Sequence, residues 1–398
     1  MSPLHSHLKN ALLGLFTIFF LLLLLTGCGS GVDSGGTGAA AASASGPITG
    51  FGSVIVNGVH FDESHATITD ADGTPHHRDD LKLGMTTQIR GSALVVNANE
   101  TRSIADSIVF SSAILGPIES IDTQARKLTV LGQSVDVSSM TIFDDSLTGG
   151  LTALAVGDVI LVYALFDGAD STYSATRIEP KSGVAAYELR GVANNLNTSL
   201  REFSIGKLRI SYAGIDPKKV PPSLANGRLV RLKLQTAMTT GVVNAMQVLD
   251  GVNQLGEHDE VRIEGLISSS GSNGQFTVEG VPVDAAQAGV SGNAGLGVGM
   301  RVEVEGTVSS GVLVATKVHS KTQKEVEGEG FELDGSIAAL DPVNRTLVVR
   351  GISVDYSGTV EFRDGTIADM AVGKKVEIKG TLSSDRTGLS AVRIKFKH

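Results

Sequence analysis

The segment RVEVEGTV, residues 301–308, decides the fold of this chain, and residues 375–382, KVEIKGTL, repeat its pattern. Apolar and charged residues alternate in both segments, which is typical of a β-strand with one buried and one exposed face. A glycine, Gly306 or Gly380, interrupts each alternation. A glycine at such a point suits a bulge that lets a short sheet curve and close on itself. The two segments therefore predict a curved antiparallel sheet that recurs along the chain.

Three markers recur in constant order around these segments. An Ala-x-x-aliphatic motif ends each copy, at residues 105–108, 175–178, 245–248, 315–318 and 391–394. A glycine precedes each long fourth strand, at Gly84, Gly157, Gly227, Gly299 and Gly373. Another glycine enters a short strand, at Gly58, Gly132, Gly206, Gly280 and Gly351. The first four motifs are evenly spaced and the fifth follows after a slightly longer interval, so we expect five copies of one module.

The fourth copy shows the expected strand order most clearly. We expect strands at residues 261–267, 275–279, 281–284, 300–308 and 312–319, joined by turns rich in Ser, Gly and Asn. One helical turn closed by a glycine is expected before each long fourth strand, at residues 81–84, 154–157, 224–227 and 370–373. Such a module suggests a small closed barrel, similar in strand count to the oligonucleotide/oligosaccharide-binding fold. A two-layer β-sandwich is the alternative, because periodicity does not separate the two.

The predicted fold is all-β, with five tandem small antiparallel β-barrels or β-sandwiches behind a signal peptide and a tether. The predicted boundaries are 1–27 for the signal peptide, 28–46 for the tether, and 47–111, 112–182, 186–250, 257–320 and 331–398 for the modules. A module of this size buries only about 60% of its unfolded surface, so neighbouring modules are expected to dock into a quasi-one-dimensional rod. Residues 320–330, rich in Lys and Glu, are interpreted as a spacer.

The segment 1–27 predicts export. Its apolar run, 11–26, is shorter than the ~20 residues that a membrane-spanning helix needs. The run ends in Leu25-Thr26-Gly27-Cys28, which resembles the bacterial lipobox, and Cys28 is the only cysteine of the chain. The resemblance implies cleavage before Cys28, a diacylglyceryl group on its sulfur and an acyl chain such as palmitate on the new amino group. An uncleaved signal-anchor helix is the alternative.

The residues after Cys28 predict where the protein is anchored. Gly29, rather than Asp, follows the cysteine, and by resemblance to the enterobacterial sorting rule this implies the outer membrane. Residues 29–46 are Gly, Ala, Ser and Thr except for Val32 and Asp33, a composition typical of a flexible tether. We therefore expect a lipid-anchored protein of the bacterial cell envelope, on its periplasmic or surface face.

Composition excludes several chemistries. One cysteine rules out an intramolecular disulfide, a zinc site built on two or more cysteines, and a thioredoxin-type pair. A net charge of −9 and the absence of Trp disfavour nucleic acid as a partner. The sequence contains no Gly-x-Ser-x-Gly, no His-Glu-x-x-His and no phosphate-binding loop. We therefore predict no enzyme activity, no cofactor and no catalytic residues.

Copy one carries the candidate metal ligands. Four of its histidines lie close together in the sequence: His60, His65, His76 and His77. Three carboxylates lie among them: Asp62, Glu63 and Asp79. A divalent metal site is possible chemistry there, but the spacing matches no known ligand pattern, and polar loop residues are the favoured interpretation. Residues 70–73 and the pair Asp144 and Asp145 are calcium candidates in the same sense, with solvated turns favoured. No metal residue is therefore assigned.

The opening residues 50–61, GFGSVIVNGVHF, together with the recurrent Leu-x-x-Gly and Ala-x-x-Ile marks, resemble the bacterial DUF5666 family of domains of unknown function. The resemblance covers residues 47–398 and is strongest in copies one, four and five, whereas copy three departs through residues 212–222. Members of that family are typically exported, often carry a lipobox and hold the domain in tandem. The resemblance implies an architecture, with no activity and no functional residues to transfer.

Together these observations predict a lipid-anchored, extracytoplasmic, non-enzymatic scaffold or protein-binding spacer. Its expected partners are the membrane, through lipidated Cys28, and an unidentified envelope protein or ligand. A ligand- or metal-binding envelope protein with a specialised, histidine-bearing first module is the alternative. A third class is an enzyme whose residues assemble across a module junction.

Overall fold

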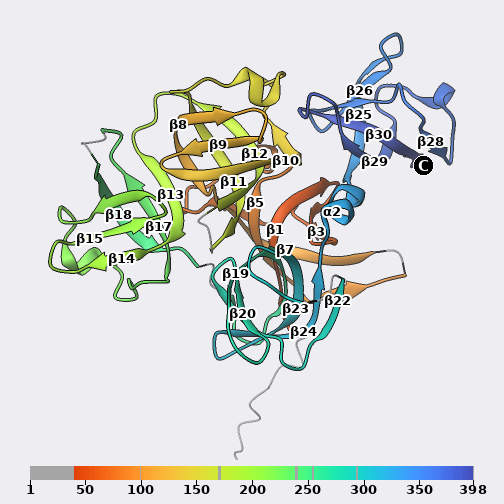
Figure 1. Cartoon of the computed structure of the whole chain (residues 1–398). Helices are drawn as coiled ribbons and strands as arrows, with labels where there is room; N and C mark the ends of the chain where they lie inside the picture. The colour runs from red at the N-terminus through yellow and green to blue at the C-terminus, as the bar shows by residue number, and fades with distance from the viewer. Residues whose placement is uncertain are drawn as a thin grey trace, which may run out of the picture. The chain divides into compact units, whose positions relative to one another are not determined.

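The computed structural model describes residues 40–98, 100–168, 172–237, 241–252, 255–292 and 295–397. The predicted signal peptide, Cys28 and the tether up to residue 39 lie outside the described residues. Within the described residues, no helix has the length and apolar content needed to span a membrane. These residues form β-strands almost throughout, with α2 (Gln323–Glu329) as their α-helix (Figure 1). The predicted all-β class is confirmed.

The strands of residues 260–320 close into a ring, which we call the fourth barrel. Its strands are β19 (Glu260–Ser270), β20 (Gln275–Val278), β21 (Val281–Asp284), β22 (Gly289–Gly292), β23 (Arg301–Ser309) and β24 (Val312–Ser320). β19 pairs with β20, β20 with β21 and β23 with both β19 and β24, all antiparallel, and the parallel pair β21–β24 closes the ring. The module is therefore a small closed barrel of the OB-like kind. The short β22, parallel to β24, was not predicted.

The same ring of pairings returns in the strands on either side. The first barrel holds β1 (Ala42–Phe51), β2 (Val54–Val56), β3 (Val59–Asp62), β4 (Thr67–Asp70), β5 (Thr86–Gly91), β6 (Val95–Val96) and β7 (Thr101–Phe110). The second holds β8 (Ile114–Asp122), β9 (Lys127–Val130), β10 (Gln133–Phe143), β11 (Val159–Asp167) and β12 (Thr172–Lys181). The third holds β13 (Tyr187–Val192), β14 (Asn194–Asn197), β15 (Glu202–Ile205), β16 (Leu208–Ser211), β17 (Leu229–Leu234) and β18 (Val243–Asp250). The fifth holds β25 (Phe331–Asp341), β26 (Thr346–Val349), β27 (Ile352–Asp355), β28 (Glu361–Arg363), β29 (Lys375–Leu382) and β30 (Leu389–Phe396).

The predicted glycine bulges are present. The register of β23 against β24 shifts between Glu305 and Gly306, and that of β29 against β30 shifts between Lys379 and Gly380. A Cβ atom on Gly306 would overlap the carbonyl oxygen of Val314, and one on Gly380 would lie 2.5 Å from that of Ser390. Glycine is therefore needed because the neighbouring strand approaches the bulge too closely for a side chain.

The predicted helical turns lie at other residues. Short 3₁₀ turns are found at η1 (Arg78–Asp80), η2 (Gly150–Ala153), η3 (Pro217–Lys219) and η4 (Ile367–Asp369). In three of them the residue expected to begin a helical turn, Leu81, Leu154 or Met370, follows the 3₁₀ turn with extended backbone. Leu81 and Leu154 are buried, so the chain extends there to place them in the core. The marker glycines form a separate turn with positive φ, as at Gly84 (φ 80°).

The segment 320–330, interpreted as a spacer, connects β24 to β25 and contains helix α2, which was not predicted. Thr322 caps α2: its hydroxyl accepts a hydrogen bond from the Glu325 backbone N–H, while the Glu325 carboxylate accepts from the backbone N–H of Thr322. Val326, a residue of α2, is buried. A capping box and one buried apolar residue thus stabilise a helix in a segment whose charged composition resembles that of a linker.

Docking is not confined to neighbours in sequence. Residues 42–45 of β1 pair in parallel with residues 260–263 of β19 and antiparallel with β5 on the other side. Residues 50 and 51 pair with β25 of the fifth barrel. β1 therefore begins inside the segment that the composition predicts to be a tether, because Ala42 and Ala44 are small enough to be buried between two strands. The apolar faces of the first and fifth barrels share one core, as do those of the second and third.

Candidate functional site

The structure separates the histidines of the first barrel. The two ring nitrogens of His76 each lie 3.4 Å from a different carboxylate, that of Asp70 or that of Asp80. His60 contacts the Ser53 hydroxyl at 3.3 Å, while His65 contacts that of Ser64. Across the described ranges, no three His, Cys, Asp or Glu side chains gather closely enough to hold a metal ion.

The calcium candidate at residues 70–73 is a turn that docks onto another barrel. The Asp70 carboxylate accepts hydrogen bonds from the backbone N–H groups of Asp72 and Thr74, both at 2.9 Å. Asp72 pairs with Arg231 at 2.6 Å and with Lys233 at 2.5 Å, both on β17. Arg231 and Lys233 neutralise the Asp72 carboxylate that a calcium ion would need as a ligand. The turn instead joins the first barrel to the third.

The hairpin between the second and third strands of a barrel is a recurrent docking point. Its turn has positive φ at two successive residues, such as Glu279 (φ 51°) and Gly280 (φ 81°) in the fourth barrel. The Glu279 carboxylate pairs with Arg190 of the third barrel at 2.9 Å and accepts the backbone N–H of Phe166 of the second barrel at 2.8 Å. Arg190 also donates to the Glu279 carbonyl oxygen at 3.1 Å. One turn thus joins three barrels.

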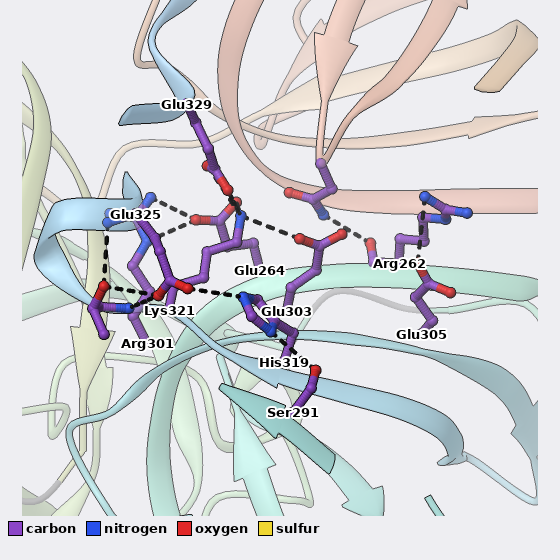
Figure 2. Close-up of polar contacts among 12 residues, drawn as sticks. Arg262, Glu264, Ser291, Arg301, Glu303, Glu305, His319, Lys321, Glu325 and Glu329 are labelled. Carbon is purple, nitrogen blue, oxygen red and sulfur yellow. Dashed lines mark hydrogen bonds and ion pairs between the residues drawn. The ribbon is translucent and has the colours of Figure 1, made fainter. Parts of the chain in front are cut away.

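Figure 2 shows a buried charge cluster where the fourth barrel meets α2. The Nζ atom of Lys321, whose side chain is 3% exposed, lies 3.3 Å from the Glu264 carboxylate, 3.1 Å from that of Glu303 and 2.9 Å from that of Glu329. Arg301 pairs with Glu264 at 2.6 Å. Burial alone would raise the pKa of Glu264, but the charges of Arg301 and Lys321 outweigh it and hold that pKa below its usual range. Burial raises the pKa of Glu303 despite the nearby Lys321.

The charge cluster fastens barrels together. Asn57, in the first barrel's hairpin turn, donates from Nδ2 to the carbonyl oxygens of Ser45 at 2.8 Å and Arg262 at 3.0 Å. Arg262 in turn pairs with Glu305 at 3.4 Å (Figure 2). Glu264 and Glu303 each lie beside a cation, so the buried carboxylates of the cluster are paired.

A cavity of about 700 Å³ lies where the first, second and fifth barrels meet. Its apolar lining comes from all three barrels: Phe51, Leu81, Leu83, Ile142, Ile352, Leu382 and Leu389. Its charged lining is Arg78, Asp79, Lys82, Asp144, Asp145, Arg177 and Arg350. The cavity thus unites Asp79 with Asp144 and Asp145, which the sequence suggested only as separate metal candidates.

Two arginines define what we call the guanidinium end of the cavity, Arg78 and Arg350. Both face the buried Glu63 carboxylate, Arg78 at 2.8 Å and Arg350 at 3.9 Å. Arg350 stands in the hairpin turn of the fifth barrel with φ 52°, and its Nε donates to the Asp334 carbonyl oxygen at 2.8 Å. Burial and then the nearby Arg78 charge lower the pKa of Arg350. Two cations therefore share one carboxylate at this end.

The carboxylate end of the cavity consists of Asp144 and Asp145. Asp144 pairs with Arg177 at 3.4 Å, and Arg177 is already held by Glu179 at 2.7 Å. Within the described part of the chain, no cation lies at ion-pair distance from Asp145. Burial and then the adjacent Asp144 charge raise the pKa of Asp145.

Sequence reasoning missed Arg350, although a signal for it exists. The residue before the hairpin glycine differs among the five copies, as Asn57, Leu131, Ile205, Glu279 and Arg350. The polar residues of this set, Asn57, Glu279 and Arg350, each have positive φ and each contact another barrel, so a polar residue before the hairpin glycine is the signal.

Comparisons with known proteins bear on the architecture alone. A solved structure described as Drosophila Unr CSD456 shares 14% identity, with 54% of this chain and 98% of that chain covered and a TM-score of 0.14. No curated protein matches the sequence.

Residues 116–179, 264–319 and 334–395 match the family model described as Domain of unknown function (DUF5666). These segments fall in the second, fourth and fifth barrels. The match thus includes the second copy, whereas the sequence placed the strongest resemblance in copies one, four and five. Each of these three segments matches the DUF5666 family, which is the family that the sequence resembles.

Proposed function

We propose that this protein is an exported, non-enzymatic, lipid-anchored binding protein of the bacterial cell envelope that holds a small ligand between its barrels. The observation that carries the proposal is the cavity of about 700 Å³ lined by side chains of three barrels. Ligand sites are typically about 300–1,000 Å³, mostly apolar, and located between domains with a few converging polar groups. The cavity has such a volume and such a position between barrels, and its lining combines apolar with charged side chains.

The contacts between distant barrels favour binding over spacing. A spacer gains reach when each module contacts only its neighbours. Here β1 pairs with β19 of the fourth barrel and with β25 of the fifth. The second pairing brings together two residues that line the cavity, Phe51 of the first barrel and Ile352 of the fifth.

The binding proposal is tested by native mass spectrometry of the full chain isolated from bacterial membranes. We expect a non-covalent adduct that is absent from Thr387→Trp, because Thr387 lines the cavity at a half-buried position where an indole would fill it. Thr381→Trp, at an exposed position of β29, is the matched control and should retain the adduct. An adduct equally abundant in all three proteins would place the ligand elsewhere, and its absence from the unaltered chain would count against binding.

Anchoring through Cys28 is proposed separately and has its own test. Cells fed a radioactive fatty acid should label the unaltered protein but not Cys28→Ala, because the thiol is the predicted acceptor. If the variant takes up label, Cys28 is not the anchor.

A scaffold for an envelope protein is the second candidate. It is favoured by the Arg190–Glu279 pair, in which both side chains are 9% exposed and which joins the third barrel to the fourth. Affinity capture from envelope extract, with and without Arg190→Met, should then recover the same partner only with the unaltered chain.

A further inference from the structure

The third barrel differs from the rest of the chain in its charge. Residues 186–250 contain nine Lys and Arg but four Asp and Glu, a net charge of +5, whereas the whole chain carries −9. Three of these cations pair with carboxylates of other barrels: Arg190, Arg231 and Lys233. The lysines of η3, Lys218 and Lys219, are both exposed, and neither makes an ion pair with a residue that the structure describes. Their charges are therefore available to a partner outside the chain.

The Arg201 side chain holds the segment 212–222, where copy three departs from the repeat. Its guanidinium donates to the carbonyl oxygens of Ala213 at 3.0 Å and Ile215 at 2.6 Å, and lies 5.2 Å from the centre of the Tyr212 ring. The backbone N–H of Tyr212 in turn donates to the Arg201 carbonyl oxygen at 2.9 Å. Arg201 thus joins the turn before β15 to this segment at one end of the β15–β16 hairpin.

The turn η3 presents its lysines on an ordered backbone. Pro217 is the first residue of the turn, and the Asp216 carboxylate accepts the Lys218 backbone N–H at 3.0 Å. The Glu202 carboxylate, at the same end of the hairpin, pairs with Arg209 at 2.9 Å. Both of these carboxylates therefore have partners other than the lysine ammonium groups.

Two exposed apolar side chains lie at the same end of the barrel. Leu200, 61% exposed, immediately precedes Arg201, the residue that holds the segment 212–222. Met246, 50% exposed, lies on β18 just beyond the point where this strand pairs with Ser211, the last residue of β16. We call these two apolar residues and the two lysines of η3 the basic tip of the third barrel.

We propose that the basic tip binds the surface of an anionic phospholipid bilayer, with its lysines at the lipid phosphates and its apolar side chains among the headgroups. Exposed lysines beside exposed apolar side chains gain at such a surface from both charge attraction and burial. The proposed lipid anchor would keep a bilayer within reach of the tip, which favours lipid over a soluble acidic partner. This contact goes beyond ligand binding in the cavity and does not depend on it.

A single tryptophan tests the contact, because the chain contains none. Leu200→Trp places an indole at the tip, and Val156→Trp, at a position of the second barrel that is 65% exposed, is the matched control. Each full chain, isolated from bacterial membranes, is added to vesicles of phosphatidylglycerol or phosphatidylcholine with brominated acyl chains, which quench an indole that reaches them. We expect Leu200→Trp to lose roughly half of its fluorescence on phosphatidylglycerol alone, and Val156→Trp to lose none on either lipid.

Charge substitutions show whether the lysines make the contact. In the Leu200→Trp chain, the double substitution Lys218→Gln and Lys219→Gln should remove most of the quenching. Lys207→Gln should retain it, because Lys207 is exposed in the turn at the opposite end of the β15–β16 hairpin. Salt at about 1 M should also remove the quenching, because it screens charges beyond about 3 Å.

Three results would overturn the proposal. Leu200→Trp that stays unquenched on phosphatidylglycerol would leave an acidic protein as the partner of the tip. Equal quenching on both lipids, or quenching that survives the loss of both lysines, would show that the tip does not recognise anionic lipid. None of these results bears on the cavity ligand or on Cys28, each of which has its own test.

Discussion

At the residue scale, Lys321 illustrates how a buried charge is tolerated. Its ammonium has three carboxylate partners within 3.3 Å, and the two 3%-exposed side chains of Lys321 and Glu264 lie side by side. Burying such ions is costly, but once they are buried the removal of one partner costs more than the pair contributes.

We expect Lys321→Met to lower the free energy of unfolding by about 3–5 kcal/mol, because Glu264 and Glu303 would be left buried with fewer cations. Urea unfolding measures the loss. Lys317→Met is the control: Lys317 pairs with Glu305 but its side chain is 71% exposed, so a change within about 1 kcal/mol is expected. Equal losses in both variants would show that burial of the cluster does not matter.

The lowered pKa of Glu264 predicts a dependence on pH. A carboxyl group with a lower pKa in the folded chain stabilises it above the unfolded pKa, roughly 4.3, and this stabilisation is lost as the pH falls through the folded value. Glu264→Gln should therefore be less stable than the unaltered chain at pH 7, and the difference should narrow toward pH 3. Urea unfolding at several pH values measures it, with Glu260→Gln, at an exposed position of β19, as control. A difference that stays constant contradicts the prediction.

At the element scale, a glycine in a strand bulge and a glycine in helix α2 differ in whether a side chain would fit. Gly306 stands where the backbone of β24 leaves no room for a Cβ atom, whereas Gly328 in α2 has no heavy atom within 4 Å of that position. Both are glycines in regular elements, and only the neighbouring strand distinguishes them.

Gly306→Ala should lower the free energy of unfolding by about 1–3 kcal/mol, because the new methyl group forces β23 and β24 apart at the bulge. Gly328→Ala is the matched control and should raise it by about 0.5–1 kcal/mol, since alanine favours a helix interior. Thermal unfolding of both variants gives the comparison. No loss of stability in Gly306→Ala would mean that the bulge accommodates a side chain.

At the scale of the whole molecule, a few contacts between barrels determine which barrels meet. Arg190 connects the third barrel to the Glu279 turn of the fourth, and the same carboxylate accepts the Phe166 N–H of the second. The β1 pairings do the same for the first, fourth and fifth barrels.

Arg190→Met should therefore speed hydrogen exchange at the Phe166 amide at least tenfold, because Glu279 loses its cation and the three barrels separate more often. Mass spectrometry of exchanged peptides measures this rate. Arg201→Met is the control: Arg201 bonds the carbonyl oxygens of Ala213 and Ile215 within its own barrel, and its loss should leave Phe166 protected. Unchanged exchange in Arg190→Met would show that the joint does not hold the barrels.

The sequence alone determined a repeated antiparallel β-module, because its causes are local, whereas the parallel pairing that closes each ring was seen only in the structure. Alternation in segments such as residues 301–308, the bulge glycines and the hairpin glycines act within one copy, where residues that meet are a few tens of positions apart. Tertiary structure alone decided which barrels touch and where the cavity lies. Those contacts join residues hundreds of positions apart, such as the Arg350 guanidinium and the Gly52 carbonyl oxygen, and no periodic pattern records them. Single turn residues, such as Glu279 and Arg350, make contacts that differ from barrel to barrel. The groups that they meet on another barrel come within reach only once the chain has folded.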